Sequence, residues 1–207
     1  MFAKHQVKIM KWAMKNEDNI FNLILMVSLS IRQPWAVIGK QLQDVQANGS
    51  NSKYLFGSKK DLYFHVMENK QSIFQLLKDT KAGKVSQADC LYKLTQIPGL
   101  GLAKAGFVMQ LAIGMAGCID SHNVTMYGVN PNALKMGKVK AEKALEKAKM
   151  YLDLCEKLGG TEFLWDNWCN FVATRHPKHF EDGYDVSARH CSYLGIKPQS
   201  FMERLFS

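Results

Sequence analysis

The sequence predicts an all-α protein, and three observations carry that prediction. Apolar residues recur at spacings of three and four over long stretches, which is the period of an amphipathic helix. Only five prolines interrupt the 207 residues. No strand-rich stretch competes with the helical pattern. We therefore expect helices throughout, arranged as one unit or as two lobes that share a core.

The first third of the chain predicts three helices and a loop. A basic, amphipathic helix is expected at 4–15. A second begins at Asp18 or Asn19, where an Asp or Asn cap precedes the apolar residues from Ile20. Pro34 marks a break or a first helical turn before a helix at 35–44. Residues 46–61 are rich in Gly, Ser and Asn, which predicts an exposed loop.

Helices continue along the rest of the chain. One is expected at 62–80 and another from Ser86 or Gln87 to 96, followed by a tight glycine turn and a helix that ends near Gly114. A small loop at 119–123 then leads to a lysine-rich helix at 138–158 and to a long helix at 161–174. A short helix is expected at 185–194.

Charge and cysteine usage narrow the class of function. Twenty-seven Lys and Arg against 18 Asp and Glu give a net charge of +9, which favours a polyanionic partner, with nucleic acid first. The five cysteines are odd in number and never spaced CxxC, so we expect reduced, packed thiols rather than a disulfide framework or zinc ribbon.

Targeting signals are not apparent. The longest apolar run, 20–29, is too short to span a bilayer, and the first residues lack the apolar core and cleavage site of a signal peptide. We expect an intracellular monomer, in the cytoplasm or with the DNA of a nucleoid or nucleus, and no membrane partner.

The most informative segment is IPGLGLAKAGFV, residues 97–108. Gly99 and Gly101 permit a tight turn between two helices, and they let the backbone N–H groups that begin the second helix approach an anion such as a phosphate. Lys104, in the first turn of that helix, can add a charge-assisted contact. A connection that only packs the two helices together is the alternative.

These residues resemble the helix-hairpin-helix of the HhH-GPD DNA glycosylase superfamily, which includes endonuclease III, MutY-type adenine glycosylases and 8-oxoguanine glycosylases. The family signature continues with an aspartate about fifteen positions after the hairpin alanine, and Asp120 follows Ala105 by fifteen. The resemblance covers about residues 18–175 and is most specific at 97–124. It implies contacts to double-stranded DNA from Pro98, Gly99, Leu100, Gly101, Lys104 and Ala105.

The resemblance implies a bilobed helical HhH-GPD fold with the hairpin and Asp120 facing a cleft. The hairpin lobe would comprise about 45–125, and 1–44 with 126–207 would form the second lobe. Asp120 would be the essential carboxylate, since breaking a base–sugar bond places positive charge on the sugar of a nucleotide extruded from the stack. Asp120 can equally cap the helix that Ser121 enters, and the two roles can coexist.

The chain departs from the family pattern at two places. Relatives that also cut the strand carry a lysine nucleophile where this sequence has Ala103. Lys104 is one residue later, about 100° around the helix, so we expect base excision without lyase activity. The four cysteines that hold the iron–sulfur cluster of some relatives are missing after Thr174, so no cluster is predicted and no cofactor is required.

Other positions are weaker candidates. Arg32 and Gln33 match the place where relatives insert polar side chains into the gap left by the extruded base, but they can also be ordinary loop residues. His122, Asn123 and Trp165 are candidates for the base pocket, although the tryptophans at 165 and 168 fit a packed core better.

Two sets of residues are candidates for a metal site. By position in the resembled family, the backbone carbonyls of Thr95, Ile97 and Leu100 would hold a monovalent cation. The residues His176, His179, His190 and Cys191 lack a familiar metal-ligand spacing.

The favoured function is therefore monofunctional DNA N-glycosylase activity, as in base excision repair. One alternative is a glycosylase-like enzyme of DNA base hypermodification, in which an amine displaces a pyrophosphate on a modified thymine. Another is a DNA-binding protein without catalytic activity. The sequence does not identify the base.

Overall fold

The computed structural model describes residues 2–30, 33, 37–137 and 139–198, and for residues 2, 3, 122 and 133 it describes the backbone alone. Within these ranges the chain is all-α, with no strand, as the sequence predicts. The elements in order are α1 (Phe2–Ala13), α2 (Glu17–Leu29), α3 (Ile38–Asn48), the 3-10 helix η2 (Gly49–Asn51), α4 (Ser58–Lys81), α5 (Gln87–Leu94), α6 (Leu102–Ile113), α7 (Ser121–Tyr127), the 3-10 helix η3 (Pro131–Leu134), α8 (Ala141–Lys157), α9 (Gly160–Arg175) and α10 (Gly183–Tyr193).

Local signals explain several helix starts. The cap of α2 is Asn16 and not Asp18 or Asn19 as expected: its side chain accepts the N–H of Asn19. Ser86 caps α5, as expected, by accepting the N–H of Asp89. Helix α10 begins two residues earlier than expected because Asp182 and Asp185 form a reciprocal capping box. Each of these caps satisfies N–H groups that the first helical turn leaves without an intrahelical acceptor.

The segment predicted as an exposed loop at 46–61 is more ordered than expected. Helix α3 continues to Asn48, and η2 follows directly. The hydroxyl of Ser52 donates to the carboxylate of Asp44 at 2.5 Å, and Leu55 is buried in the core. This polar contact attaches Ser52 to α3, and α4 begins at Ser58, four residues earlier than expected.

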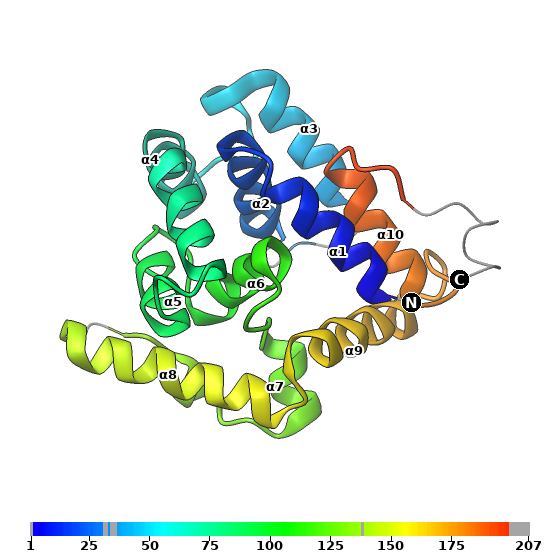
Figure 1. Ribbon diagram of the computed structural model, residues 1–207. Coiled ribbons are helices and arrows are strands. Elements are labelled where there is room, and N and C mark those ends of the chain that lie inside the picture. The colour runs from blue at the N-terminus through cyan, green and yellow to red at the C-terminus, as the bar shows by residue number, and fades with distance from the viewer. Residues whose placement is uncertain (1, 31–32, 34–36, 138, 199–207) are drawn as a thin grey trace.

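Two helices occupy the centre of the molecule (Figure 1). In α2, Ile20 and every residue from 23 to 29 are buried, and in α6, Leu102 and every residue from 105 to 113 are buried. They pack against each other, and α1 and α4 pack against both of them (Figure 1). A helix that is apolar on all sides is stable only when other helices surround it, which explains why these two are central.

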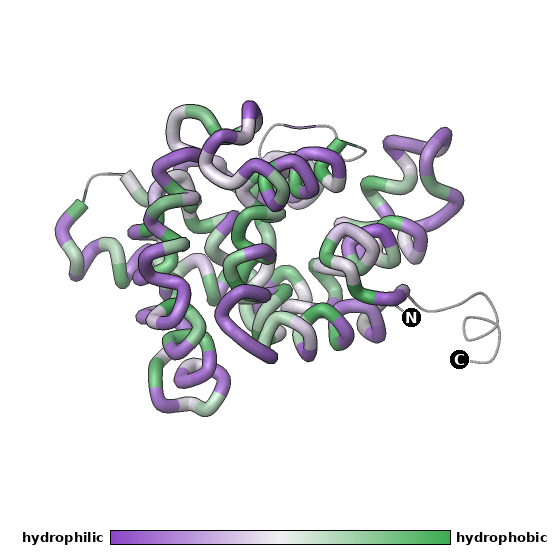
Figure 2. The backbone as a smooth tube through the Cα atoms, turned by 90° about the horizontal axis from the view of Figure 1, so that it is seen from above, coloured by the Kyte–Doolittle hydropathy of each residue, from purple (hydrophilic) through white to green (hydrophobic). Residues whose placement is uncertain are grey.

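The remaining helices close around this pair. Helix α1 lies beside α9 and α10, so the two ends of the described chain meet on one side of the molecule (Figure 1). Helix α8 packs against α5 and α9. Seen from above, hydrophobic and hydrophilic residues alternate along the outer helices (Figure 2). The buried apolar residues from all of these helices form one cluster. The division into two lobes at 45 and 125 stays a prediction.

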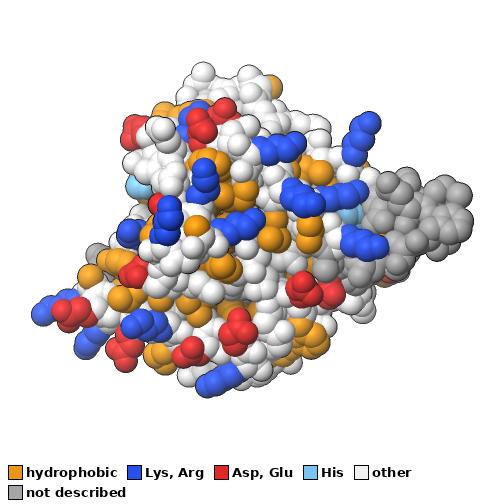
Figure 3. Space-filling model, in the orientation of Figure 1, with side chains coloured by type: hydrophobic (Ala, Val, Ile, Leu, Met, Phe, Trp, Pro, Cys, Tyr) orange, Lys and Arg blue, Asp and Glu red, His pale blue; other side chains and the backbone are white. Residues whose placement is uncertain are grey.

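The surface carries the excess of positive charge. Lys and Arg side chains outnumber Asp and Glu over the middle of the face seen in Figure 3. Among the described helices, none combines the length and the hydropathy needed to cross a membrane.

Candidate functional site

The turn between α5 and α6 is a compact corner. The N–H of Leu100 donates to the carbonyl of Ile97 at 3.0 Å, and both side chains are buried. Gly99 has a φ of +79°, in the left-handed region that favours glycine. A Cβ at Gly99 would also lie 3.5 Å from Oγ of Ser58, because the turn rests against the first residue of α4. The sequence pattern therefore forms the predicted tight connection.

Gly101 leaves the start of α6 open. Its φ of −82° is available to any residue, and it caps the helix without a side-chain bond. A Cβ at this position would meet no atom within 4 Å. The carbonyl of Gly101 accepts the N–H groups of Lys104 and Ala105, while the N–H groups that precede them have no intrahelical acceptor. A phosphate can therefore approach this helix end closely, with a favourable dipole.

Lys104 does not extend away from the molecule as a simple phosphate ligand would. Its Nζ donates to Oγ of Ser30, at the end of α2, at 3.1 Å, and lies 5.7 Å from the ring centroid of Phe107. The side chain is half-buried. Lys104 can contact DNA only from this inner position or after leaving Ser30. The hairpin alanine, Ala105, is fully buried and can act only through packing.

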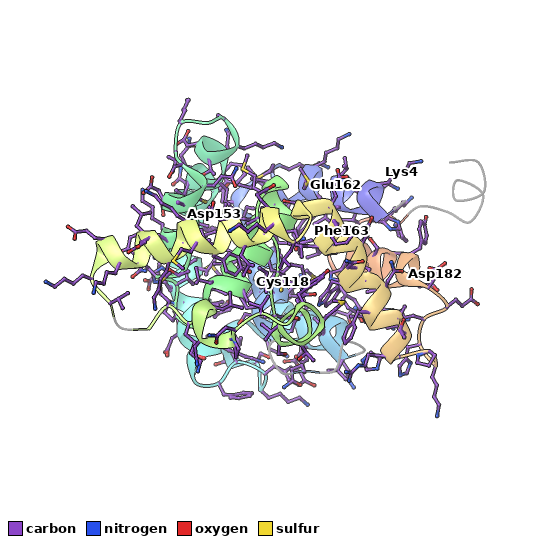
Figure 4. All side chains as sticks on the ribbon, turned by 90° about the horizontal axis from the view of Figure 1, so that it is seen from below. Lys4, Cys118, Asp153, Glu162, Phe163 and Asp182 are labelled. Carbon is purple, nitrogen blue, oxygen red and sulfur yellow. The ribbon has the colours of Figure 1, made fainter. Side chains whose placement is uncertain are left out.

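The segment that leads to Asp120 is attached to α6. Gly106 lies so close to it that a Cβ there would occupy the space of the Gly117 carbonyl oxygen. The side chain of Gln110 accepts the N–H of Cys118 at 3.2 Å. Figure 4 shows Cys118 inside the molecule, and burial raises its pKa to about 12 (Figure 4). Helix α6 therefore carries both the hairpin and the support for the aspartate.

Helix α8 supplies a second attachment. The hydroxyl of Tyr151 donates to the carbonyl of Gly117 at 2.7 Å and accepts the N–H of Ile119 at 2.9 Å. Tyr151 is 2% exposed, and burial raises its pKa well above 10, so the hydroxyl keeps its proton. The two bonds fix the backbone immediately before Asp120.

Asp120 is half-buried and its two carboxylate oxygens contact different elements. Oδ1 accepts the N–H of Asn123 at 3.2 Å, which is the capping role that the sequence allowed. Oδ2 accepts the indole N–H of Trp168, on α9, at 3.2 Å. One oxygen therefore serves as a cap of α7, and the other contacts a tryptophan 48 positions away.

The structure distinguishes the two tryptophans that the sequence could not. Trp165 is 1% exposed and donates its indole N–H to Oγ of Ser187, so it belongs to the core rather than to a base pocket. Trp168 is half-buried and contacts Asp120. The spacing of three between them already placed both on one face of a helix, but it did not show which of them reaches the aspartate.

The remaining candidates are placed as follows. Gln33 is half-buried and its Oε1 accepts the side-chain N–H of Gln41 at 3.2 Å. Asn123 is fully buried, where its side chain donates to the carbonyl of Cys118, so it supports the turn and is not exposed to a base. Arg32 and the side chain of His122 lie outside the described residues.

The proposed cation ligands lie together at the hairpin. Thr95 is the C-cap of α5, and Ile97 and Leu100 form the turn, with the Ile97 carbonyl already accepting the Leu100 N–H. Elsewhere in the described chain, no group of three or more His, Cys, Asp or Glu side chains is arranged to hold a metal ion. His190 and Cys191 are buried, whereas His176 and His179 are exposed.

The environments of the five cysteines do not favour a catalytic or metal-binding thiolate. All five thiols are buried and free of disulfides. Burial raises the pKa of each of them, to about 11 for Cys90 and Cys191 and to about 12 for Cys118 and Cys155. A protonated, buried thiol is a poor nucleophile and a poor metal ligand.

The cleft expected beside Asp120 is not among three cavities found in the described structure. The largest, about 490 Å³, lies between the far end of α7 and helix α8, with Tyr127, Leu134, Met150 and Lys157 in its lining. The other two, of about 270 and 280 Å³, lie against α4. Asp120 and Lys104 line none of them.

One surface next to the hairpin was missed. Phe56 is 62% exposed, and the Nζ atoms of Lys53 and Lys59 lie over the rings of Tyr54 and Phe56 at 5.3 and 5.6 Å. These residues lie within five positions of Ser58, the residue against which the turn at Gly99 rests. The cluster YLFGSKK at 54–60 was the available signal, hidden in a stretch that composition marked as a polar loop.

Comparison with known proteins identified no relative. No family model, curated protein or solved structure matches this chain.

Proposed function

We propose that the protein is a DNA-base-processing enzyme, a monofunctional DNA N-glycosylase that acts on a modified or damaged nucleotide extruded from the duplex. The main observation behind this proposal is that one helix, α6, supports both the hairpin turn and Asp120. Its start forms the open turn at Gly101, and its buried face packs against the segment that ends in Asp120. A phosphate bound at the turn would therefore have a fixed position relative to the carboxylate.

The chemistry assigned to Asp120 follows from its charge and its support. Departure of the base leaves a transition state with oxocarbenium character, and a carboxylate held beside it stabilises that charge without moving. The N–H of Asn123 and the indole of Trp168 hold the carboxylate in place. Ala103 provides no amine at the position where lyases of the resembled family have their nucleophile, which supports hydrolysis without strand cleavage.

The surface beside the hairpin fits a nucleic-acid partner. Phe56 offers an exposed aromatic ring. Lys53, Lys59 and Lys60 lie in the stretch 45–60, which contains no acidic residue. Aromatic rings stack on bases and lysines contact phosphates, which gives binding that weakens as salt rises.

None of the three cavities described above includes Asp120, and we expect the site to form around the nucleotide as it enters. Extrusion of a base and closure of a site around it commonly accompany each other. A monovalent cation at the carbonyls of Thr95, Ile97 and Leu100 would add positive charge at the phosphate contact.

Base release from defined duplexes tests the proposal. The purified protein is incubated with duplexes that contain uracil, oxidised bases or alkylated bases, and the free base is measured. Asp120→Asn is the matched variant, since Asn keeps the capping oxygen and removes the charge. We expect release of at least one base by the wild type and a loss of more than a hundredfold in the variant, because electrostatic groups of this kind contribute about 10²–10³ in rate.

Two other results would redirect the assignment. Full activity of Asp120→Asn would remove the catalytic role of this residue. Duplex binding without release of any base, unchanged by Asp120→Asn, would indicate a DNA-binding protein.

A further inference from the structure

Trp168 makes a contact with Asp120 that capping of α7 does not require. A capping aspartate needs one oxygen, and here Oδ1 accepts the N–H of Asn123 while Oδ2 receives the indole N–H. The first donor belongs to the backbone of α7 and the second to the side chain of α9. Two donors from different elements fix the plane of the carboxylate, whereas one leaves it free to rotate.

The indole is itself held by its neighbours. Trp168 stacks on Trp165 with a centroid distance of 6.3 Å and an interplanar angle of 23°, and its ring lies 5.9 Å from Phe107 and 5.5 Å from His190. Trp165 is in turn anchored to Ser187 through its indole N–H. The cluster joins α6, α9 and α10, so Trp168 has little freedom to leave Asp120.

The cluster adds no positive charge of its own beside the carboxylate. Burial lowers the pKa of His190 to about 3, so the imidazole is neutral at physiological pH. Lys104, on α6, has its Nζ directed at Ser30 and at the Phe107 ring. The indole N–H of Trp168 is therefore a neutral donor that orients Asp120 without neutralising it.

We propose that Trp168 is a positioning residue for the reaction, and that its indole N–H sets the orientation in which Asp120 faces the sugar of the extruded nucleotide. The inference rests on the proposed function, because it specifies how the same carboxylate is prepared. The proposal gives α9 a role in catalysis. Neither the hairpin nor the fifteen-residue spacing from Ala105 to Asp120 indicates such a role.

The first test needs no substrate. The indole N–H signals of the full chain are recorded by ¹H–¹⁵N NMR, and the Trp168 signal is identified by its absence in Trp168→Phe. Because a hydrogen bond to a carboxylate deshields the donor proton, Asp120→Asn is expected to move the Trp168 signal upfield and to leave that of Trp165 nearly in place. An unchanged Trp168 signal would overturn the inference.

The second test measures the reaction on whichever duplex the wild type processes. Trp168→Phe is expected to lower kcat by about tenfold to a hundredfold, which is the effect of one lost hydrogen bond to a charged group, with KM unchanged. Trp165→Phe is the matched control, since it removes the same atoms from the same cluster but no contact with Asp120. In the Asp120→Asn background, Trp168→Phe should cause no further loss.

The outcomes separate the two proposals. Equal loss of kcat in Trp165→Phe and Trp168→Phe would show that the cluster acts only through stability, and the positioning role would be wrong. If the wild type releases no base, the glycosylase assignment fails, and the NMR comparison alone decides whether Trp168 orients Asp120.

Discussion

Replacement of Tyr151 by Phe removes one buried hydroxyl oxygen. It tests how much the hydrogen bonds that hold the segment before Asp120 contribute to stability. The hydroxyl makes two buried hydrogen bonds, to the Gly117 carbonyl at 2.7 Å and from the Ile119 N–H at 2.9 Å. Without it, one donor and one acceptor of the backbone lose their partners inside the protein. Each such group costs about 1–3 kcal/mol, so Tyr151→Phe is expected to lower the free energy of unfolding by about 2–6 kcal/mol.

The measurement is urea denaturation at pH 7, followed by circular dichroism. The phenyl ring remains, so packing changes little and the dependence of the free energy on urea should match that of the wild type. Tyr127→Phe is the control, since its hydroxyl accepts one bond from Asn167 at 2.7 Å in a half-buried position. We expect the control to lose about 1 kcal/mol or less.

Base release should fall together with stability in Tyr151→Phe, measured at a temperature where the variant is fully folded. The reason is that the residues immediately before Asp120 would no longer be fixed. Equal destabilisation by the two Tyr→Phe changes would refute the reasoning, because it would mean that water or a backbone shift replaces both bonds of Tyr151.

Three further predictions follow from packing, open space and burial. Gly106→Ala places a methyl group where the Gly117 carbonyl lies, and denaturation should show a loss of about 1–3 kcal/mol. A Cβ at Gly101 would meet no atom within 4 Å, so Gly101→Val should change the temperature of thermal unfolding by a few degrees at most. Its affinity for an abasic-analogue duplex, measured by fluorescence anisotropy, should fall at least tenfold, and unchanged affinity would contradict close contact at the turn. Burial lowers the pKa of His5 to about 4 and of His190 to about 3, below the unfolded value of 6.5, so stability is complete above pH 6.5 and decreases as the pH falls toward these values. Between pH 7 and pH 5 each histidine should remove about 2 kcal/mol, and urea denaturation of His190→Gln should show about half of the wild-type pH dependence.

Helices could be predicted from the sequence wherever the residues that specify them, caps and regularly spaced apolar residues, lie within one helical turn of each other. The cap at Ser86 and the apolar spacing of α2 and α6 act over three or four residues, and the structure has helices at these places. The cap of α2 was expected at Asp18 or Asn19, but it is Asn16. The segment at 46–61 differs because its order depends on the contact of Ser52 with Asp44 and on burial of Leu55 in a core built from distant helices. Composition alone cannot show such contacts.

The candidate site could be predicted only in part, because some of its contacts join residues that are far apart in the sequence. Asp120 and the hairpin are close in sequence, and their spacing is fixed by one helix and its return. Trp168 reaches Asp120 across 48 residues, and Lys104 meets Ser30 across 74. Because each residue turns an α-helix by about 100°, Lys104 and Ala103 point in different directions. The direction of the long Lys104 side chain, however, depends on its contact with Ser30, which the sequence does not show.

Helix geometry also explains why fifteen residues separate Ala105 from Asp120. From Ala105 to the last residue of α6, Ile113, the chain rises about 12 Å away from the hairpin. Gly114 then ends the helix in the left-handed conformation, and the chain turns back until Gly117 lies against Gly106. Three further residues, at about 3.3 Å each, can carry Asp120 about 10 Å along the direction of the hairpin. A shorter return would leave the carboxylate beside the middle of α6, and a larger residue at 106 would hold the returning chain away from the helix. Under the proposed function, the spacing in the sequence and the glycine pair at 106 and 117 are two consequences of one requirement, that a single helix must present both its own start and the aspartate to the same strand.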